Sequence, residues 1–111
     1  PHPVYSREGN DLVMTLPVTV SEAILGATID VPMIDGNTAT VKVPAGSSSG
    51  AEIRVRGEGV KTSKTTGDLI ARLSIQVPAK PSRELKKLAK DMAKAEGDLD
   101  VRASLAKAAE E

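Results

Sequence analysis

The sequence predicts a mainly β fold, a small antiparallel β-sandwich with a short turn helix and C-terminal helices. Apolar residues fall on every second position in five runs between residues 11 and 77, and this period of two is typical of strands. Glycine, proline, asparagine and aspartate separate the runs, as expected for turns. Helical spacing dominates only after Pro78 and Pro81. The apolar face of each strand must be buried against another apolar surface, so we expect two sheets packed face to face, with mainly antiparallel meander pairing.

The longest run covers residues 11–20 and organises the rest of the chain. We expect Val4–Ser6 to pair with it as a hairpin, through a turn at Arg7–Asn10. Ser21 follows the run and is predicted to cap a single helical turn, which ends at Gly26. One face of the run is wholly apolar and consists of Leu12, Met14, Leu16, Val18 and Val20.

Four further runs alternate in the same way. Asp35-Gly36 predicts a hairpin between the first two of them. Pro44-Ala45-Gly46 ends the next strand, and a polar loop at Gly57–Gly67 precedes the last one. The inward residues are expected to be Ile29, Val31 and Met33; Ala39, Val41 and Val43; Ala51, Ile53 and Val55; and Leu69, Ala71, Leu73, Ile75 and Val77.

The C-terminal part is predicted to be helical. Ser82 can cap a helix that Gly97 would end, and Asp98 or Asp100 can cap a second short helix. We therefore divide the chain into a β-sandwich, residues 1–81, and a helical segment, residues 82–111. The first helix has one apolar face, formed by Leu85, Leu88, Ala89 and Met92. The apolar stripe of the second is narrow and needs a partner to pack against; it consists of Val101, Leu105 and Ala108.

Composition excludes several classes of function. The 111 residues suffice for one aliphatic core, and Tyr5 is the only aromatic residue. Fifteen basic and fifteen acidic side chains cancel, which argues against nucleic acid as a partner, and no apolar run is long enough to span a membrane. Cysteine is absent, so disulfides and thiolate metal sites are excluded, in keeping with the reducing cytoplasm. The chain begins at Pro1 without a signal peptide, and we expect it to be a piece of a longer protein.

No motif for catalysis stands out, and we expect neither an enzyme nor a cofactor. His2 is the only histidine, so a histidine metal cluster or a Ser–His–Asp arrangement within this chain is excluded. Gly57-Glu58-Gly59 lacks the third glycine of a nucleotide loop and is interpreted as a turn. Carboxylate pairs occur at turns, where acidic residues are common; these pairs are Glu8 with Asp11 and Asp30 with Asp35.

The remaining functional surface is apolar. Aliphatic strand residues without reactive groups favour a module that binds extended polypeptide, because a peptide can add to an exposed sheet edge and place alternate side chains in apolar pockets. A module whose aliphatic residues all serve the core is the alternative.

Several motifs, in order, resemble the C-terminal substrate-binding region of DnaJ co-chaperones, most closely the second of its two β-sandwich repeats. They are PHPVYSREGNDLVMTLPVTVSEAILGATIDVPMIDG, VKVPAG, IRVRGEGV and GDLIARLSIQVP, within residues 1–97. The resemblance implies delivery of unfolded polypeptides to a DnaK-type ATPase chaperone and homodimerisation through the C-terminal end. His2-Pro3 is followed by Val4, so the signature of the ATPase-stimulating J domain is absent, as is the cysteine-rich zinc region.

The resemblance also implies site residues. The groove of the first repeat lies between two strands that match residues 14–16 and 29–33, which makes Met14, Leu16, Val31 and Met33 candidates for peptide binding. The dimer contact would fall in Leu99–Ala109, on Leu99, Val101, Leu105 and Ala108. In the alternative function, the sandwich is a structural spacer and dimerisation module that sets the distance to another, client-binding repeat.

Overall fold

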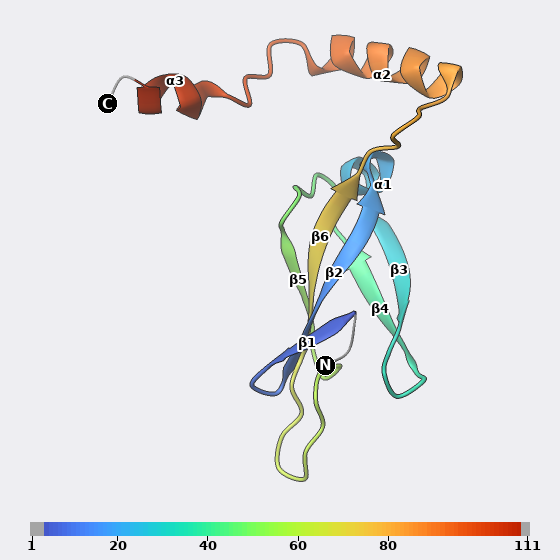
Figure 1. The fold of residues 1–111 in the computed structure, drawn as a ribbon, viewed down its shortest axis with the longest axis vertical. Coiled ribbons are helices and arrows are strands. Elements are labelled where there is room, and N and C mark those ends of the chain that lie inside the picture. The colour runs from blue at the N-terminus through green and yellow to red at the C-terminus, as the bar shows by residue number, and fades with distance from the viewer. Residues whose placement is uncertain (1–3, 110–111) are drawn as a thin grey trace. The chain divides into compact units, whose positions relative to one another are not determined.

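A computed structural model describes residues 4–109, and of residues 106–108 only the backbone. The described residues fall into two units, 4–77 and 78–109. The first holds two β-sheets and one short helix, and the second holds two helices (Figure 1). The elements are β1 (Tyr5–Glu8), β2 (Asp11–Thr19), α1 (Val20–Leu25), β3 (Ala27–Pro32), β4 (Thr38–Val43), β5 (Glu52–Val55), β6 (Leu69–Gln76), α2 (Arg83–Glu96) and α3 (Ala103–Ala109).

The larger sheet has the strand order β1-β2-β6-β5, and β3 and β4 form a second sheet. The prediction of a mainly β fold with two sheets is confirmed. Three strand pairs are antiparallel, including the expected β1–β2 hairpin. The central pair, β2 with β6, is parallel from Leu12↔Leu69 to Thr19↔Gln76, which differs from the meander interpretation. Parallel pairing joins strands far apart in the sequence, so local turn signals do not reveal it.

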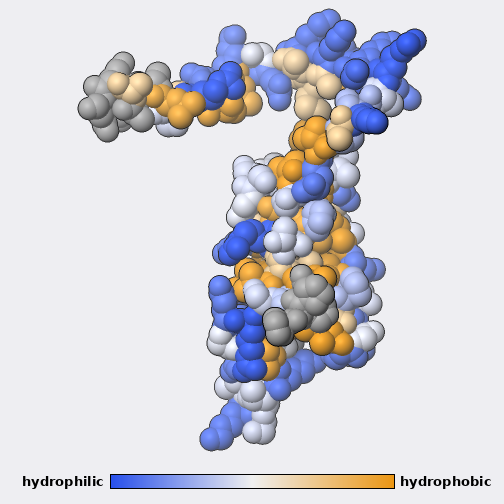
Figure 2. Space-filling model, in the orientation of Figure 1, coloured by the Kyte–Doolittle hydropathy of each residue, from blue (hydrophilic) through white to orange (hydrophobic). Residues whose placement is uncertain are grey.

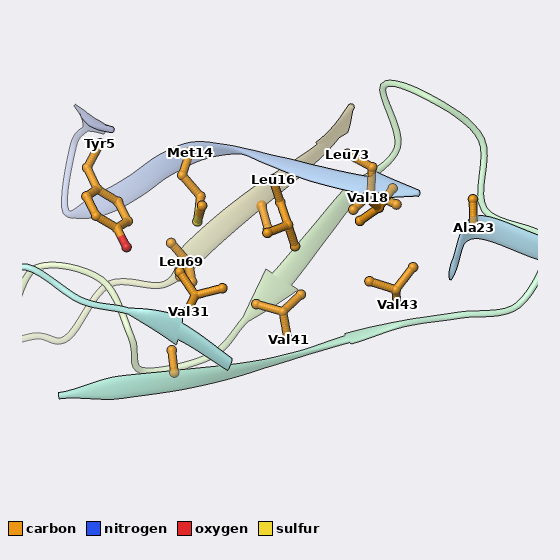
Figure 3. Packing of buried hydrophobic residues seen from close by; sticks show 12 residues of the cluster. Tyr5, Met14, Leu16, Val18, Ala23, Val31, Val41, Val43, Leu69 and Leu73 are labelled. Atoms are coloured by element: carbon orange, nitrogen blue, oxygen red, sulfur yellow. The ribbon is translucent and has the colours of Figure 1, made fainter. Parts of the chain in front are cut away.

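The core lies between the inner faces of the two sheets. Side chains of β1, β2 and β6 point towards those of β3 and β4 (Figure 3), and α1 adds Ala23 at one end. Alternation along the strands explains this arrangement, because every second residue faces the opposite sheet. The buried residues of this cluster are Tyr5, Met14, Leu16, Val18, Ala23, Val31, Ala39, Val41, Val43, Leu69, Ala71 and Leu73.

Two side chains depart from the predicted pattern. Val77 was expected to face inwards, but it follows the end of β6 and is exposed. Val13 lies on the other face of β2 and is nevertheless buried. It occupies an inner strand, with Ser6 on one side and Ile70 on the other, and these flanking strands limit its contact with water.

Two element boundaries differ from the predicted ones. The N-cap of α1 is Thr19 and not Ser21: Thr19 Oγ1 accepts from Glu22 N, and Glu22 Oε1 accepts from Thr19 N at 2.8 Å. This reciprocal capping box satisfies two backbone donors, whereas a cap at Ser21 lacks it. The first strand also extends through Arg7 and Glu8, so only Gly9 and Asn10 form the turn.

The second unit consists of α2 and α3. Ser82 Oγ accepts from Leu85 N at 3.0 Å, and Gly97 adopts a positive φ of 60° at the C-terminal end of α2, so both predicted ends of this helix are confirmed. Neither aspartate caps α3 at the expected position: Asp100 accepts from Arg102 N, and Val101 precedes the helix. No residue of α2 is buried, and among the described residues no helix has the length and apolarity to cross a membrane.

Candidate functional site

A shallow apolar hollow of about 330 Å³ lies between β2 and β3. Its volume is near the lower limit of ordinary ligand pockets. All four peptide-binding candidates line it: Met14 and Leu16 from β2, and Val31 and Met33 from the end of β3 and the turn beyond. The other lining residues are Val4, Tyr5, Ile29, Asp30, Pro32 and Ile34.

The four candidates differ in how much of each side chain is accessible. Met14 and Leu16 are each 6% exposed and Val31 is 4% exposed, so they form the floor and also belong to the core. Met33 is half-buried, and Ile34 beside it is 55% exposed. The floor is therefore mostly closed, and Met33 and Ile34 offer the accessible aliphatic surface.

Sequence reasoning missed Ile34. It occupies the turn between β3 and β4, where polar residues are usual, and this exposed aliphatic side chain beside Asp35-Gly36 was the available signal. Figure 2 shows hydrophobic side chains interspersed among hydrophilic ones on one face of the first unit.

Tyr5 closes one end of the hollow. Its hydroxyl donates to the carbonyl oxygen of Pro32 and lies 3.7 Å from Met33 Sδ. Burial raises the pKa of the Tyr5 phenol, because the charged phenolate is disfavoured away from water. The neutral phenol is the form that can donate this hydrogen bond, so Tyr5 ties β1 to the end of β3 over a wide pH range.

One edge of β3 has no strand partner among the described residues, because β3 pairs only with β4. Met33 N donates to Asn37 O at 2.7 Å, and antiparallel pairs alternate between bonded and non-bonded positions. By this alternation the backbone groups of Thr28 and Asp30 face away from β4. An extended chain can therefore find main-chain hydrogen-bonding groups beside the hollow.

Three of the four carboxylates considered for catalysis have structural partners. Asp11 Oδ1 accepts from Asp68 N at 2.8 Å, and Asp30 Oδ1 accepts from Thr40 Oγ1 at 3.0 Å. Asp35 Oδ1 accepts from Asn37 N at 2.9 Å and so forms an Asx turn. These partners explain acidic residues at turns and strand ends without a catalytic role.

The loop between β5 and β6 is fixed at its base by a charged cluster. Arg54 Nη1 lies 2.8 Å from Asp68 Oδ2 and 3.5 Å from Asp11 Oδ2, and Gly57 N donates to Asp68 Oδ1 at 3.0 Å. Hydrogen bonds from Gly57 and then Arg54 lower the pKa of the Asp68 carboxyl. Gly57-Glu58-Gly59 thus belongs to a structural turn. No group of three or more potential metal ligands occurs in the part of the chain that the structure describes.

The residues predicted to form a dimer contact lie in the second unit. Leu99, Val101 and Leu105 are each more than 60% exposed, and the side chain of Ala108 lies outside the described residues. These three side chains therefore present apolar surface that the described part of this chain does not bury. The dimer contact itself stays a prediction.

Fold and hollow together define a small two-sheet β module with an apolar cleft beside an open strand edge. Residues 1–78 match the family model described as the DnaJ C terminal domain. The chain therefore belongs to the DnaJ C-terminal domain family, and the resemblance found in the sequence is confirmed.

Curated relatives carry matching names. The chain is 38% identical over 98 residues to the chaperone protein DnaJ of Treponema denticola, an alignment that covers 87% of this chain and 26% of that protein. Chaperone protein DnaJ 1 of Streptomyces coelicolor is 38% identical over 109 residues, with coverage of 97% and 27%. Chaperone protein DnaJ 2 of Cutibacterium acnes is 46% identical over 79 residues, with coverage of 70% and 21%. The chain thus spans about a quarter of the length of these relatives.

Proposed function

We propose that this chain is a non-enzymatic chaperone module of DnaJ type that binds unfolded polypeptide at the hollow between β2 and β3. The observation that carries the proposal is the combination of the apolar hollow with an edge of β3 that has no strand partner among residues 4–109. A client segment in extended conformation would lie along β3 and bond to the backbone of Thr28 and Asp30. Its alternate side chains would enter the hollow over Met14, Leu16, Val31 and Met33.

The partners follow from family membership. We expect the parent protein to act in the cytoplasm with a DnaK-type chaperone, to which it delivers the polypeptide. This chain lacks the J-domain signature, so we expect it to hold clients without stimulating ATP hydrolysis.

A titration with an aliphatic-rich extended peptide tests the groove. Methyl and amide NMR signals of the four candidate residues should shift, and Met33→Ala should weaken binding by about fivefold or more, because removal of a partly buried methionine side chain loses roughly 1–2 kcal/mol of apolar contact. Met92→Ala in α2 is the matched control and should bind as the original chain does. Shifts that spare all four residues would reject this groove.

A structural spacer is a second candidate function. It is favoured by the burial, within the core, of the three residues that form the floor of the hollow. If the module only separates another binding repeat from the dimer contact, Met33→Ala in the parent protein leaves client capture unchanged. If Met33→Ala lowers both client capture by the parent protein and peptide binding in the NMR titration, direct binding is favoured instead.

We also propose that the tail dimerises the chain through Leu99, Val101, Leu105 and Ala108. The support is the exposure of the first three side chains, since isolated short helices are marginal without a packing partner. Sedimentation of the full chain should give twice the monomer mass, and a chain that ends at Gly97 should sediment as a monomer. Equal oligomeric states for the two chains would refute a role of the tail in dimerisation.

A further inference from the structure

The three methionines of this chain lie in three different environments. Met14 is 6% exposed in the core, and Met92 is 37% exposed on α2. Met33 is half-buried directly after β3. It lines the hollow between β2 and β3 and also a second hollow of about 350 Å³. A small solute that enters either hollow therefore reaches Met33, whereas close packing shields Met14.

The sulfur of Met33 and a backbone carbonyl lie beside the same hydroxyl group. Tyr5 Oη donates to the carbonyl oxygen of Pro32 and lies 3.7 Å from Met33 Sδ. The Tyr5 ring extends from β1 towards the second sheet (Figure 3). A phenol has one proton to donate, and a thioether sulfur is only a weak acceptor. The carbonyl of Pro32 therefore receives the stronger hydrogen bond as long as the sulfur is not oxidised.

The backbone on both sides of this contact is fixed. Met33 N donates to Asn37 O at 2.7 Å, and Gly36 N donates to Met33 O at 3.1 Å. On the opposite side, β1 pairs with β2 along its whole length. A chemical change at the Met33 sulfur therefore acts first on the hydrogen bond of the Tyr5 hydroxyl, because the two backbone segments are held in place.

Hydrogen peroxide can make such a change. A lone pair of the Met33 sulfur attacks one peroxide oxygen, an S–O bond forms and the O–O bond breaks. The other oxygen takes up the proton of the transferred oxygen and leaves as water, so the sulfur loses two electrons and the peroxide gains them. The product is a polar, chiral sulfoxide. Its oxygen is a stronger acceptor than the thioether and, when it points towards Tyr5, comes within hydrogen-bond distance of the hydroxyl.

We propose that Met33 is an oxidation site for peroxides, and that its sulfoxide takes the hydrogen bond of the Tyr5 hydroxyl away from Pro32. Oxidation thereby releases β1 from the end of β3 and places a polar oxygen in an apolar hollow. Weaker holding of polypeptide is a second consequence, which rests on the proposed function. Reduction by a methionine sulfoxide reductase, in which two thiols become a disulfide and the oxygen leaves as water, restores the original contact.

Oxidation rates test whether the site is accessible. The full, folded chain is treated with dilute hydrogen peroxide, and mass spectrometry of its digest follows each methionine. Met33 should oxidise about tenfold or more faster than Met14, and Met92 gives the rate of an exposed methionine. Equal rates for Met33 and Met14 would overturn the site, because the hollows would then give Met33 no access to the oxidant.

The carbonyl carbon chemical shift of Pro32, measured by NMR, tests the change of hydrogen-bond partner. Tyr5→Phe keeps the ring and lacks the hydroxyl, so it gives the shift of the unbonded carbonyl. Oxidation of the original chain should move the signal towards this value. Met33→Leu, which preserves side-chain size and cannot form a sulfoxide, should show no change with peroxide. A signal that stays in place after Met33 is oxidised would overturn the proposal.

Peptide binding tests the second consequence separately. The oxidised chain should bind an aliphatic-rich extended peptide about three- to tenfold more weakly, because a polar group now lines the contact. Met33→Leu should bind equally before and after peroxide, and Met92→Leu should respond as the original chain does. Unchanged affinity after oxidation of Met33 would overturn this consequence. If the untreated chain binds no peptide, the proposed function fails, and the Pro32 signal still decides whether oxidation releases β1.

Discussion

The two units of this chain use the same aliphatic residues with opposite results. In the first unit, leucine and valine side chains of strands that are distant in sequence meet and are buried (Figure 3). In the second unit, Leu85, Leu88 and Met92 form an equally regular helical stripe, yet each is more than a third exposed. Periodicity sets the local conformation in both units, whereas burial requires a second apolar surface at the right distance.

The largest expected effect comes from one leucine in each unit. Leu69 is fully buried at the start of β6, an inner strand of the larger sheet, and Leu69→Ala should lower the free energy of unfolding by about 2–5 kcal/mol, because it leaves a cavity. Leu88→Ala, at a position that is 55% exposed in α2, should change it by less than about 0.5 kcal/mol. Urea unfolding followed by Tyr5 fluorescence measures both. Equal losses would mean that α2 packs as tightly as the sheets in solution.

A glycine gives the next largest effect. A Cβ atom at Gly67 would lie 1.7 Å from the backbone oxygen of Asn10, so Gly67→Ala must push the loop away from the β1–β2 turn. We expect a loss of about 1–3 kcal/mol in the free energy of unfolding, typical of overpacking. Gly9 has open space around its Cβ position and a φ of 62°, which asparagine tolerates; Gly9→Asn should therefore be nearly neutral. Similar melting temperatures for the two variants would contradict this close approach.

The smallest effect concerns acid stability. The pKa of the Asp68 carboxyl is below its ordinary value of 3.8 in the folded chain, so its ionised form stabilises the fold above that pH. This contribution is lost as the pH falls below 3.8 and through the lower folded pKa, because the unfolded state then binds more protons.

Asp68→Asn should therefore make the stability of the first unit less dependent on pH in this acidic range. Asp91→Asn in α2 is the control, since its carboxylate forms none of the salt bridges among the described residues. Urea titrations at several pH values compare the variants. If the free energy of unfolding changes with pH as steeply in Asp68→Asn as in the original chain, the Arg54 cluster does not contribute to acid stability.

Part of the candidate site was predictable from the sequence pattern and the resemblance. Alternation placed Met14 and Leu16 on the same face of their strand, and the resemblance paired them with Val31 and Met33; all four line the hollow. Ile34 and Tyr5 were not predicted as site residues. Ile34 reaches the groove because of the shape of its turn, and Tyr5 because a strand pairing brings it to Pro32.

The sequence by itself determined the strands, the turns and α2 of the second unit, because these depend on contacts between near neighbours and on the backbone preferences of glycine, proline and capping residues. It also determined the family. Tertiary structure decided the parallel pairing of β2 with β6, the burial of Val13 and the exposure of Val77. These features arise from contacts between residues far apart in the chain, and such contacts leave no periodic pattern in the sequence.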